Sequence, residues 1–300
     1  MPEVVAVVGP TATGKSDLAV AVAESLDGEI VNADSMQLYV GMDVGTAKLP
    51  LDARHGVPHH LLDVWQISKS AAVAEYQQLA RAVIAEIRTR RRTPILVGGS
   101  GLYLRGALDR LEFPGESPDI RARLYDELER VGARALHARL ATLDATAAAS
   151  ILPSNGRRIV RALEVIELTG RPFIATMPGF ESVYDCLYLG LDRDDLDARV
   201  AQRVDHMMAS GFVDEVRGLL PAGLRGSPTA GKALGYAQLL ACLDDTGRVV
   251  GDLDEAVAVT VRATRRFVRR QRSWFRHDPR IRWFDAAAPD VLDRLLAALG

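Results

Sequence analysis

The stretch GPTATGKS (residues 9–16) follows the apolar run VVAVV (4–8) and precedes the helix-forming stretch DLAVAVAESL (17–26). Its spacing is that of a phosphate-binding loop, G-x-x-x-x-G-K-[ST], between a buried strand and a helix. The backbone N–H groups of such a loop point into one concavity at the positive end of the helix dipole. The sequence therefore predicts an α/β fold with a P-loop NTPase-like parallel sheet core, and a site for a di- or triphosphate.

Each residue of this loop is a candidate for binding phosphate oxygens. Lys15 supplies a positive charge for the terminal phosphate, and the Ser16 hydroxyl can be a ligand of Mg²⁺. A chance match in a glycine-rich turn is the alternative, but the strand and helix on either side favour the phosphate site. The residues expected to bind are Gly9, Pro10, Thr11, Ala12, Thr13, Gly14, Lys15 and Ser16.

The order of the predicted elements divides the chain into a core and an insertion. Strands alternate with helices over residues 1–112, which is typical of a parallel sheet covered by helices. Every periodic segment from 119 to 170 is helical, and the alternation then returns. The apolar patterns predict strands at 29–33, 60–64, 94–97 and 183–191, and helices at 71–92, 194–220 and 252–277. We therefore expect a core formed by 1–112 and 183–300, with C-terminal helices, and a helical insertion at 113–182.

The composition is that of a globular protein outside membranes. The chain has 300 residues, of which 48% are hydrophobic and 25% charged, and it holds no apolar run long enough to span a bilayer. Its two cysteines, Cys186 and Cys242, lie far apart without partners at zinc-binding spacing. We expect a cytoplasmic protein that does not associate with membranes.

Two further segments follow predicted strands of the core. Asp34 ends the strand at 29–33, so it lies at the same sheet edge as the phosphate loop, where a carboxylate can act as a general base or hold Mg²⁺ through water. The alternative is that Asp34 caps the next turn. Ser100 follows the strand at 94–97 and offers a hydroxyl to a ligand, or to the N-terminus of the next helix. Lys48, in the glycine-rich segment GMDVGTAK (41–48), either reaches a phosphate or RNA backbone or is an ordinary solvated lysine.

The C-terminal helix is rich in arginine. Seven arginines lie within the fifteen residues 262–276, although the net charge of the chain is −2. Arginine planes, with Phe267 and Trp274 on another face of the same helix, suit RNA phosphates and unstacked bases. The alternative is an amphipathic helix with core-packed aromatic rings and solvated arginines.

An ordered series of motifs carries a resemblance over nearly the whole chain. The motifs are GPTATGKS (9–16), DSMQLY (34–39), GMDVGTAK (41–48), PHHLLD (58–63), ILVGGSGLY (95–103), RRIVRALEV (157–165), ASGFVDEV (209–216), ALGY (233–236) and ATRRFVRRQRSWFR (263–276). The series resembles the bacterial-type tRNA dimethylallyltransferases, also called isopentenyl-diphosphate:tRNA transferases.

The resemblance implies an enzyme that transfers a dimethylallyl group from dimethylallyl diphosphate to N6 of the adenosine at tRNA position 37. The phosphate loop would hold the diphosphate, with Thr11 and Lys15 among the catalytic residues and Ser16 helping to hold Mg²⁺. Asp34 would accept the N6 proton, and Arg203 would be a further diphosphate contact.

The resemblance also implies contacts with the anticodon stem-loop of tRNA. The residues assigned to these contacts are Asp34, Ser35, Met36, Gln37, Ser100, Arg121, Arg157, Arg158, Arg161 and Lys232. We expect the enzyme to be a monomer. From the residues alone, an ATP-dependent kinase of small molecules and a non-catalytic RNA-binding NTP sensor stay open as alternatives.

Overall fold

The computed structural model describes residues 2–173 and 179–300. The contacts divide the chain into two compact units. The core unit comprises Met1–Arg110 and Ser182–Gly300, and the helical unit comprises Leu111–Glu181. Residues 174–178 of the expected insertion lie outside the described residues.

The core unit is built on one sheet of six parallel strands in the order β3-β2-β4-β1-β5-β6. The strands are β1 (Val4–Val8), β2 (Gly28–Asn32), β3 (His59–His60), β4 (Thr93–Gly98), β5 (Cys186–Asp192) and β6 (Ile281–Asp285). A parallel sheet needs a crossover between neighbouring strands, and helices provide most of them. This arrangement confirms the predicted α/β class.

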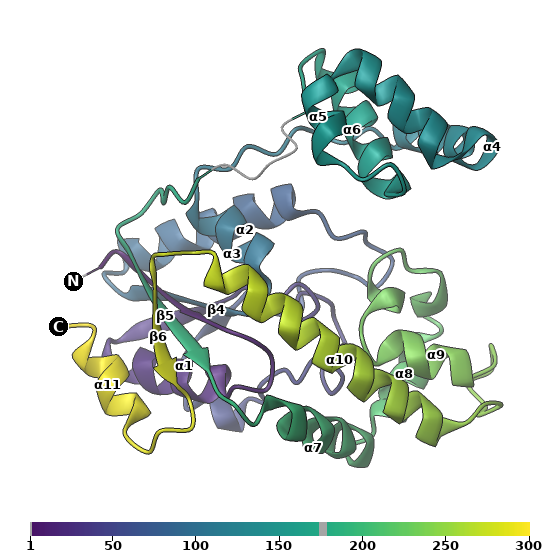
Figure 1. Ribbon diagram of the computed structural model, residues 1–300. Helices are drawn as coiled ribbons and strands as arrows, with labels where there is room; N and C mark the ends of the chain where they lie inside the picture. Colours follow the sequence, from purple (N-terminus) through teal and green to yellow (C-terminus); the bar gives the residue numbers. More distant parts are fainter. Residues whose placement is uncertain (1, 174–178) are drawn as a thin grey trace. The chain divides into compact units, whose positions relative to one another are not determined.

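Helices cover both faces of the sheet (Figure 1). Strand β1 is buried on both sides, so it reads as a continuous apolar run. Val5 and Val7 pack with α1 (Lys15–Ser25) and α11 (Val291–Ala297). Val4, Ala6 and Val8 share the other cluster with α2 (Val73–Thr89) and α3 (Gly101–Leu108). The phosphate loop therefore begins at a strand fixed on both faces.

Four further helices complete the core unit. They are α7 (Leu196–Ala209), α8 (Phe212–Leu219), α9 (Tyr236–Cys242) and α10 (Leu253–Arg276). The single helix expected over 194–220 is wrong, because Gly211 adopts φ 89° and separates α7 from α8. Short 3₁₀ turns occur at Asp52–Arg54, Leu224–Gly226 and Ala230–Lys232. Within the described ranges, no helix combines the length and apolarity that a membrane crossing requires.

The edges of the sheet differ from the sequence expectation. The strand expected at 60–64 is wrong, since β3 ends at His60 and both Leu61 and Asp63 have positive φ, 61° and 56°. Such left-handed residues cannot continue an extended strand. The sequence pattern did not predict β6, an edge strand with exposed Arg282 and half-exposed Trp283.

Ion pairs hold the two chain segments of the core unit that lead to the helical unit. Val183 N–H donates to Leu108 O at 2.8 Å, and an antiparallel bridge joins Asp109 to Ser182. The Asp109 carboxylate is 0% exposed and accepts from Arg105 Nε at 2.6 Å and from Arg280 Nη1 at 2.7 Å. A buried carboxylate needs such partners, so the network fixes these segments within the core unit.

The helical unit has its own apolar core. It consists of α4 (Pro118–Leu143), α5 (Ala145–Ser150) and α6 (Gly156–Thr169). Ser117, Asp144 and Asn155 each cap a helix by accepting a backbone N–H. Gly132, at φ 81° and ψ 163°, interrupts α4, and Leu124 before it and Leu136 after it belong to the same apolar cluster.

Candidate active site

The phosphate loop connects β1 to α1 in a conformation that only glycine accepts at two positions. Gly9 has φ 145°, and a Cβ there would lie 2.1 Å from Leu191 O. Gly14 has φ 91° and precedes the first residue of α1. Thr13 Oγ1 donates to Pro10 O at 3.0 Å, and Lys15 Nζ donates to the same carbonyl at 2.5 Å. These bonds hold the loop in its curled form, with Lys15 folded back over it.

One pocket gathers the candidate residues from several segments of the core unit. Its polar lining consists of Thr11, Lys15, Ser16, Asn32, Asp34, Gln37, Thr46, His59, Arg203 and Gln271. The phosphate loop, the end of β2, the segment 41–48 and helices α7 and α10 all contribute. A wider cavity adjoins it and shares Lys15, Ser16 and Arg203. The structure therefore brings Lys15, Asp34 and Arg203 together from far-apart sequence positions.

The charges of this pocket suit an anion. Burial and the nearby charge of Arg203 together lower the pKa of Lys15 to about 7, although the attraction of Asp34 acts in the opposite direction. Burial also lowers the pKa of Arg203, again against the attraction of Asp34. Two cations that face one carboxylate leave a net positive charge, which a bound diphosphate would neutralise.

Helix α7 ties the phosphate loop to the segment 41–48. Arg199 Nε donates to Ala12 O at 2.8 Å, and Arg203 Nη2 donates to Thr46 O at 3.4 Å. The two arginines lie four residues apart, so they project from the same side of the helix. Arg203 thus reaches the pocket from a helix that also holds the loop.

Asp34 caps the turn after β2 and lines the pocket as well. Met36 N–H donates to Asp34 Oδ1 at 3.0 Å, and Asp34 N–H donates to Asn32 Oδ1 at 2.9 Å. Tyr76 OH holds Asn32 O from α2 at 2.9 Å. Among the described residues, Asp34 Oδ2 accepts no hydrogen bond, which leaves it available to a ligand proton. Asp34 therefore both caps the turn and lines the pocket.

The segment after Asp34 meets the segment after β4. The Ser35 and Ser100 hydroxyls lie 3.4 Å apart, and Ser35 N–H also points at Ser100 Oγ at 3.4 Å. Gln37 Nε2 donates to Thr46 O at 3.1 Å, whereas Met36 packs against the apolar core. Ser35, Gln37 and Ser100 thus lie at the same edge of the sheet.

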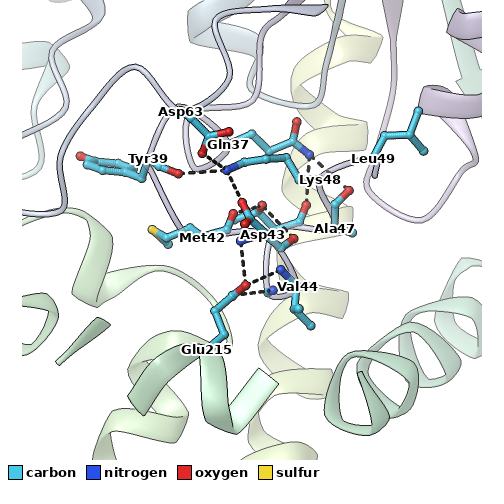
Figure 2. Close-up of polar contacts among 12 residues, drawn as sticks. Gln37, Tyr39, Met42, Asp43, Val44, Ala47, Lys48, Leu49, Asp63 and Glu215 are labelled. Atoms are coloured by element: carbon cyan, nitrogen blue, oxygen red, sulfur yellow. Dashed lines mark hydrogen bonds and ion pairs between the residues drawn. The ribbon is translucent and has the colours of Figure 1, made fainter. Parts of the chain in front are cut away.

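Lys48 has a structural position that the sequence did not reveal. Its side chain is 4% exposed, and its ammonium group donates to Asp43 and Asp63 at 2.5 Å each and to Tyr39 O at 3.0 Å (Figure 2). The solvated lysine is therefore wrong. Since an ammonium group has three donors, these contacts also leave none for phosphate or RNA.

Comparison with known proteins decides the family. The profile described as IPP transferase matches residues 37–278. The chain belongs to the IPP transferase family. Its tRNA dimethylallyltransferase relatives include one from Streptomyces coelicolor, 62% identical over 302 residues that cover 99% of this chain and 96% of the relative. Another, from Streptomyces avermitilis, is 61% identical over 97% of this chain and 93% of the relative.

Solved structures of IPP transferase family relatives share the fold. The tRNA isopentenylpyrophosphate transferase of Bacillus halodurans is 38% identical, with a TM-score of 0.70 over 99% of this chain and 96% of that chain. A transferase from Staphylococcus epidermidis is 30% identical, with a TM-score of 0.71 over 99% of this chain and 98% of that chain. The P-loop α/β fold is therefore that of this family.

The arginines of α10 fall into two groups in this family member. Some are held by acidic or backbone groups: Arg262 by Glu255, Arg265 by Asp197 O, and Arg272 by Asp192. Among the described residues, Arg266, Arg269 and Arg270 form no ion pair, and all three are exposed. Trp274 is 40% exposed and Phe267 half-buried. The RNA contact of the exposed arginines stays a prediction, and the alternative of core-packed aromatic rings is wrong for the exposed Trp274.

The candidate tRNA residues of the helical unit also differ from one another. Arg121 Nη2 and Arg161 Nη1 donate to the fully buried Glu164 carboxylate at 2.9 and 3.0 Å. Arg157 and Arg158 are exposed in the first turn of α6. The first two have a structural role within the unit, and the other two face solvent. Lys232, in the core unit, is exposed in a 3₁₀ turn.

Gln271 is a residue of the site that sequence reasoning missed. It lies in the arginine-rich segment but is 5% exposed, and it accepts from Thr11 N–H at 3.0 Å and donates to Gly99 O at 2.9 Å. A signal was present, because Gln271 shares the buried stripe of α10 with Val268 and Phe275. A polar residue on an apolar stripe needs a buried partner, and here the partner is the phosphate loop.

Proposed function

We propose that this chain transfers a dimethylallyl group from dimethylallyl diphosphate to N6 of the adenosine at position 37 of tRNA, beside the anticodon, and releases diphosphate. The observation that carries the proposal is the single pocket lined by Lys15, Asp34 and Arg203. Membership of the IPP transferase family supports the same chemistry. A carboxylate that faces two cations suits proton removal beside a departing anion.

The cations of the pocket act on the leaving group. As the bond between the allylic carbon and the diphosphate oxygen breaks, its electron pair stays with the diphosphate. Lys15, Arg203 and the N–H groups of the phosphate loop stabilise that negative charge. Preorganised charges of this kind are effective because they need no rearrangement as the reaction proceeds.

Asp34 acts on the nucleophile. The N6 lone pair forms the new bond to the allylic carbon, and a proton passes from N6 to the Asp34 carboxylate. Its Oδ1 is fixed by Met36 N–H, so the carboxylate that lines the pocket is oriented before substrate binds. Since an exocyclic amine of adenine is a weak nucleophile, a positioned base and a fixed line of attack both contribute.

The residues present fit a magnesium ion held mainly by substrate. No cluster of three or more His, Cys, Asp or Glu side chains that could hold a metal occurs in the described part of the chain. The Ser16 hydroxyl lines the pocket, and within that part it has no hydrogen-bond partner. Mg²⁺ is commonly held by one or two protein oxygens together with phosphate oxygens. Bound there by Ser16, the ion would neutralise diphosphate charge.

The tRNA would present the anticodon stem-loop with its target base turned out of the stack, because single-stranded bases are read this way. We assign contacts to Asp34, Ser35, Met36, Gln37, Ser100, Arg121, Arg157, Arg158, Arg161 and Lys232. We propose a monomeric enzyme that acts in the cytoplasm, where its tRNA substrate is made and used.

The variant Asp34→Asn tests the role of the base. The amide oxygen can still accept Met36 N–H, so the turn is kept while the proton acceptor is lost. We expect transfer to fall by about 10²–10⁴-fold, with diphosphate binding retained. Asp205→Asn, an exposed residue of α7, is the control. Unchanged turnover of Asp34→Asn would remove Asp34 from the mechanism.

A further inference from the structure

The segment 41–48 is anchored to α8 by one carboxylate. Glu215 accepts three consecutive backbone N–H groups, from Asp43 at 2.8 Å, Val44 at 2.6 Å and Gly45 at 3.0 Å (Figure 2). Tyr236 OH from α9 donates to the same carboxylate at 2.5 Å. Consecutive N–H groups that converge in this way form a site for an anion, and Glu215 occupies it.

Close packing fixes the same segment against α8 and α9. A Cβ on Gly45 would lie 2.2 Å from the Phe212 ring and 2.6 Å from the Tyr236 ring. These two rings stack edge to face with centroids 4.9 Å apart. The motifs at 209–216 and 233–236 thus share one task in the structure, which is to support the segment 41–48.

The far end of the segment is fixed as firmly as its start. Lys48 binds Asp43 and Asp63, and Thr46 Oγ1 donates to Met42 O at 2.5 Å. The segment is therefore held by Glu215 at residues 43–45 and by the Lys48 contacts at its end. Its backbone can move little while both contacts persist.

This segment joins the two sides of the proposed site. Thr46 O accepts from Gln37 Nε2 at 3.1 Å and from Arg203 Nη2 at 3.4 Å. Gln37 is assigned to tRNA and Arg203 to diphosphate, and Thr46 itself lines the pocket. A shift of one carbonyl group would therefore move both side chains together.

We propose that Glu215 is a positioning residue, which holds the segment 41–48 so that Thr46 O aligns Gln37 toward tRNA and Arg203 toward the diphosphate. The role rests on the proposed function. Glu215 itself touches neither substrate in this scheme. Its carboxylate matters because both oxygens accept: Oε2 takes two N–H groups, and Oε1 takes the third together with Tyr236 OH.

The variant Glu215→Gln tests this role. Its amide has one acceptor oxygen and one NH₂ donor, so at least one backbone N–H of the segment would face another donor. A displacement of about 1 Å in a positioning group lowers turnover by about 10²-fold. We therefore expect kcat/KM to fall by about 10–100-fold, with KM raised for both tRNA and dimethylallyl diphosphate.

The control is the preceding residue of the same helix. Asp214 is exposed and pairs only with Arg217 at 2.7 Å among the described residues, so Asp214→Asn removes an acid of α8 without touching the segment. Kinetics are measured at a temperature where thermal melts show every variant fully folded. A purely structural role of Glu215 would then leave kcat and KM unchanged.

A double-mutant cycle separates positioning from a general effect. If Glu215 acts through Gln37, then Glu215→Gln raises the KM for tRNA less in the Gln37→Ala background than in the wild type. Tyr236→Phe removes one hydrogen bond to Glu215 and keeps the ring, and we expect a smaller loss in the same direction, about twofold to fivefold. This second variant keeps the test decisive if Glu215→Gln does not fold.

The outcomes distinguish this role from the proposed function. Equal kinetics of Glu215→Gln and Asp214→Asn, or additive effects of Glu215→Gln and Gln37→Ala on the KM for tRNA, would overturn the positioning role of Glu215. Either result would leave the proposed function standing. Absence of transfer by the wild type, with inorganic diphosphate still bound, would overturn the proposed function and the role of Glu215 with it. A coupled loss, confined to Glu215→Gln and Tyr236→Phe, supports both.

Discussion

Replacing Gln271 with methionine removes the connection between α10 and the phosphate loop. The side chain is almost fully buried, and its two hydrogen bonds join Thr11 N–H to Gly99 O through one amide group. Methionine has a similar length and fills the space, but it cannot donate and accepts only weakly. The change therefore isolates the hydrogen bonds from the packing.

The expected loss follows from the two backbone groups left without a partner. An unsatisfied buried polar group costs about 1–3 kcal/mol. Gly99 O is buried and Thr11 N–H partly so, which places the loss in the free energy of unfolding of the core unit at about 2–4 kcal/mol. The loop also loses one of its restraints. If ordering it again requires about 1.4 kcal/mol, the affinity for diphosphate falls about tenfold.

Urea unfolding and calorimetric titration with inorganic diphosphate measure the two effects. The midpoint of the core transition should fall while its slope with denaturant stays constant. Gln78→Met on α2 is the matched control, because Gln78 is exposed, and its change should stay within about 0.5 kcal/mol. Equal stability and equal diphosphate affinity of Gln271→Met and Gln78→Met would refute the idea that Gln271 holds the loop.

Three other predictions concern charge. Burial and a neighbouring guanidinium lower the pKa of Lys15 to about 7, and a bound anion favours the protonated form. Diphosphate binding should therefore take up protons, and its affinity should fall from pH 7 to pH 9. Calorimetry in buffers of different ionisation enthalpy measures the proton uptake, and equal affinity across that pH range would contradict the prediction. Charge reversal of three exposed arginines should weaken tRNA binding and reduce the dependence of tRNA affinity on salt concentration. If this dependence stays the same, the three arginines do not contact tRNA. These arginines are Arg266, Arg269 and Arg270. Asp109→Asn should lower the free energy of unfolding by about 3–5 kcal/mol in urea titrations, because it takes this carboxylate from the buried Arg105 and removes one of the two carboxylates that pair with Arg280. A loss below about 1 kcal/mol would count against this.

Local sequence patterns predicted the features that depend on local physics. The phosphate loop, the parallel sheet and the arginine-rich helix each follow from periodicity and spacing within a short window. The break at Gly211 could also have been read from the sequence, since a glycine inside a helical pattern often ends the helix. The strand expected at 60–64 failed because left-handed residues there turn the chain so that Leu61 O accepts from Asn32.

Contacts between distant segments could not be predicted in this way. Gln271 reaches Thr11 across 260 positions, and Glu215 reaches Gly45 across 170. Lysine is usually a surface residue, yet three acceptors of the folded chain surround the Lys48 ammonium group. Such partners exist only after the sheet has placed its loops, and no window of sequence contains them.

The most direct measurement is a prenyl-transfer assay with unmodified tRNA, Mg²⁺ and radiolabelled dimethylallyl diphosphate. ATP is absent, and a parallel reaction contains ATP with small hydroxylated acceptors but no dimethylallyl diphosphate. We expect label in tRNA at N6 of adenosine 37, together with release of diphosphate. Absence of label, with ATP consumed in the parallel reaction, would show a small-molecule kinase and contradict the assignment of Lys15, Asp34 and Arg203 to prenyl transfer.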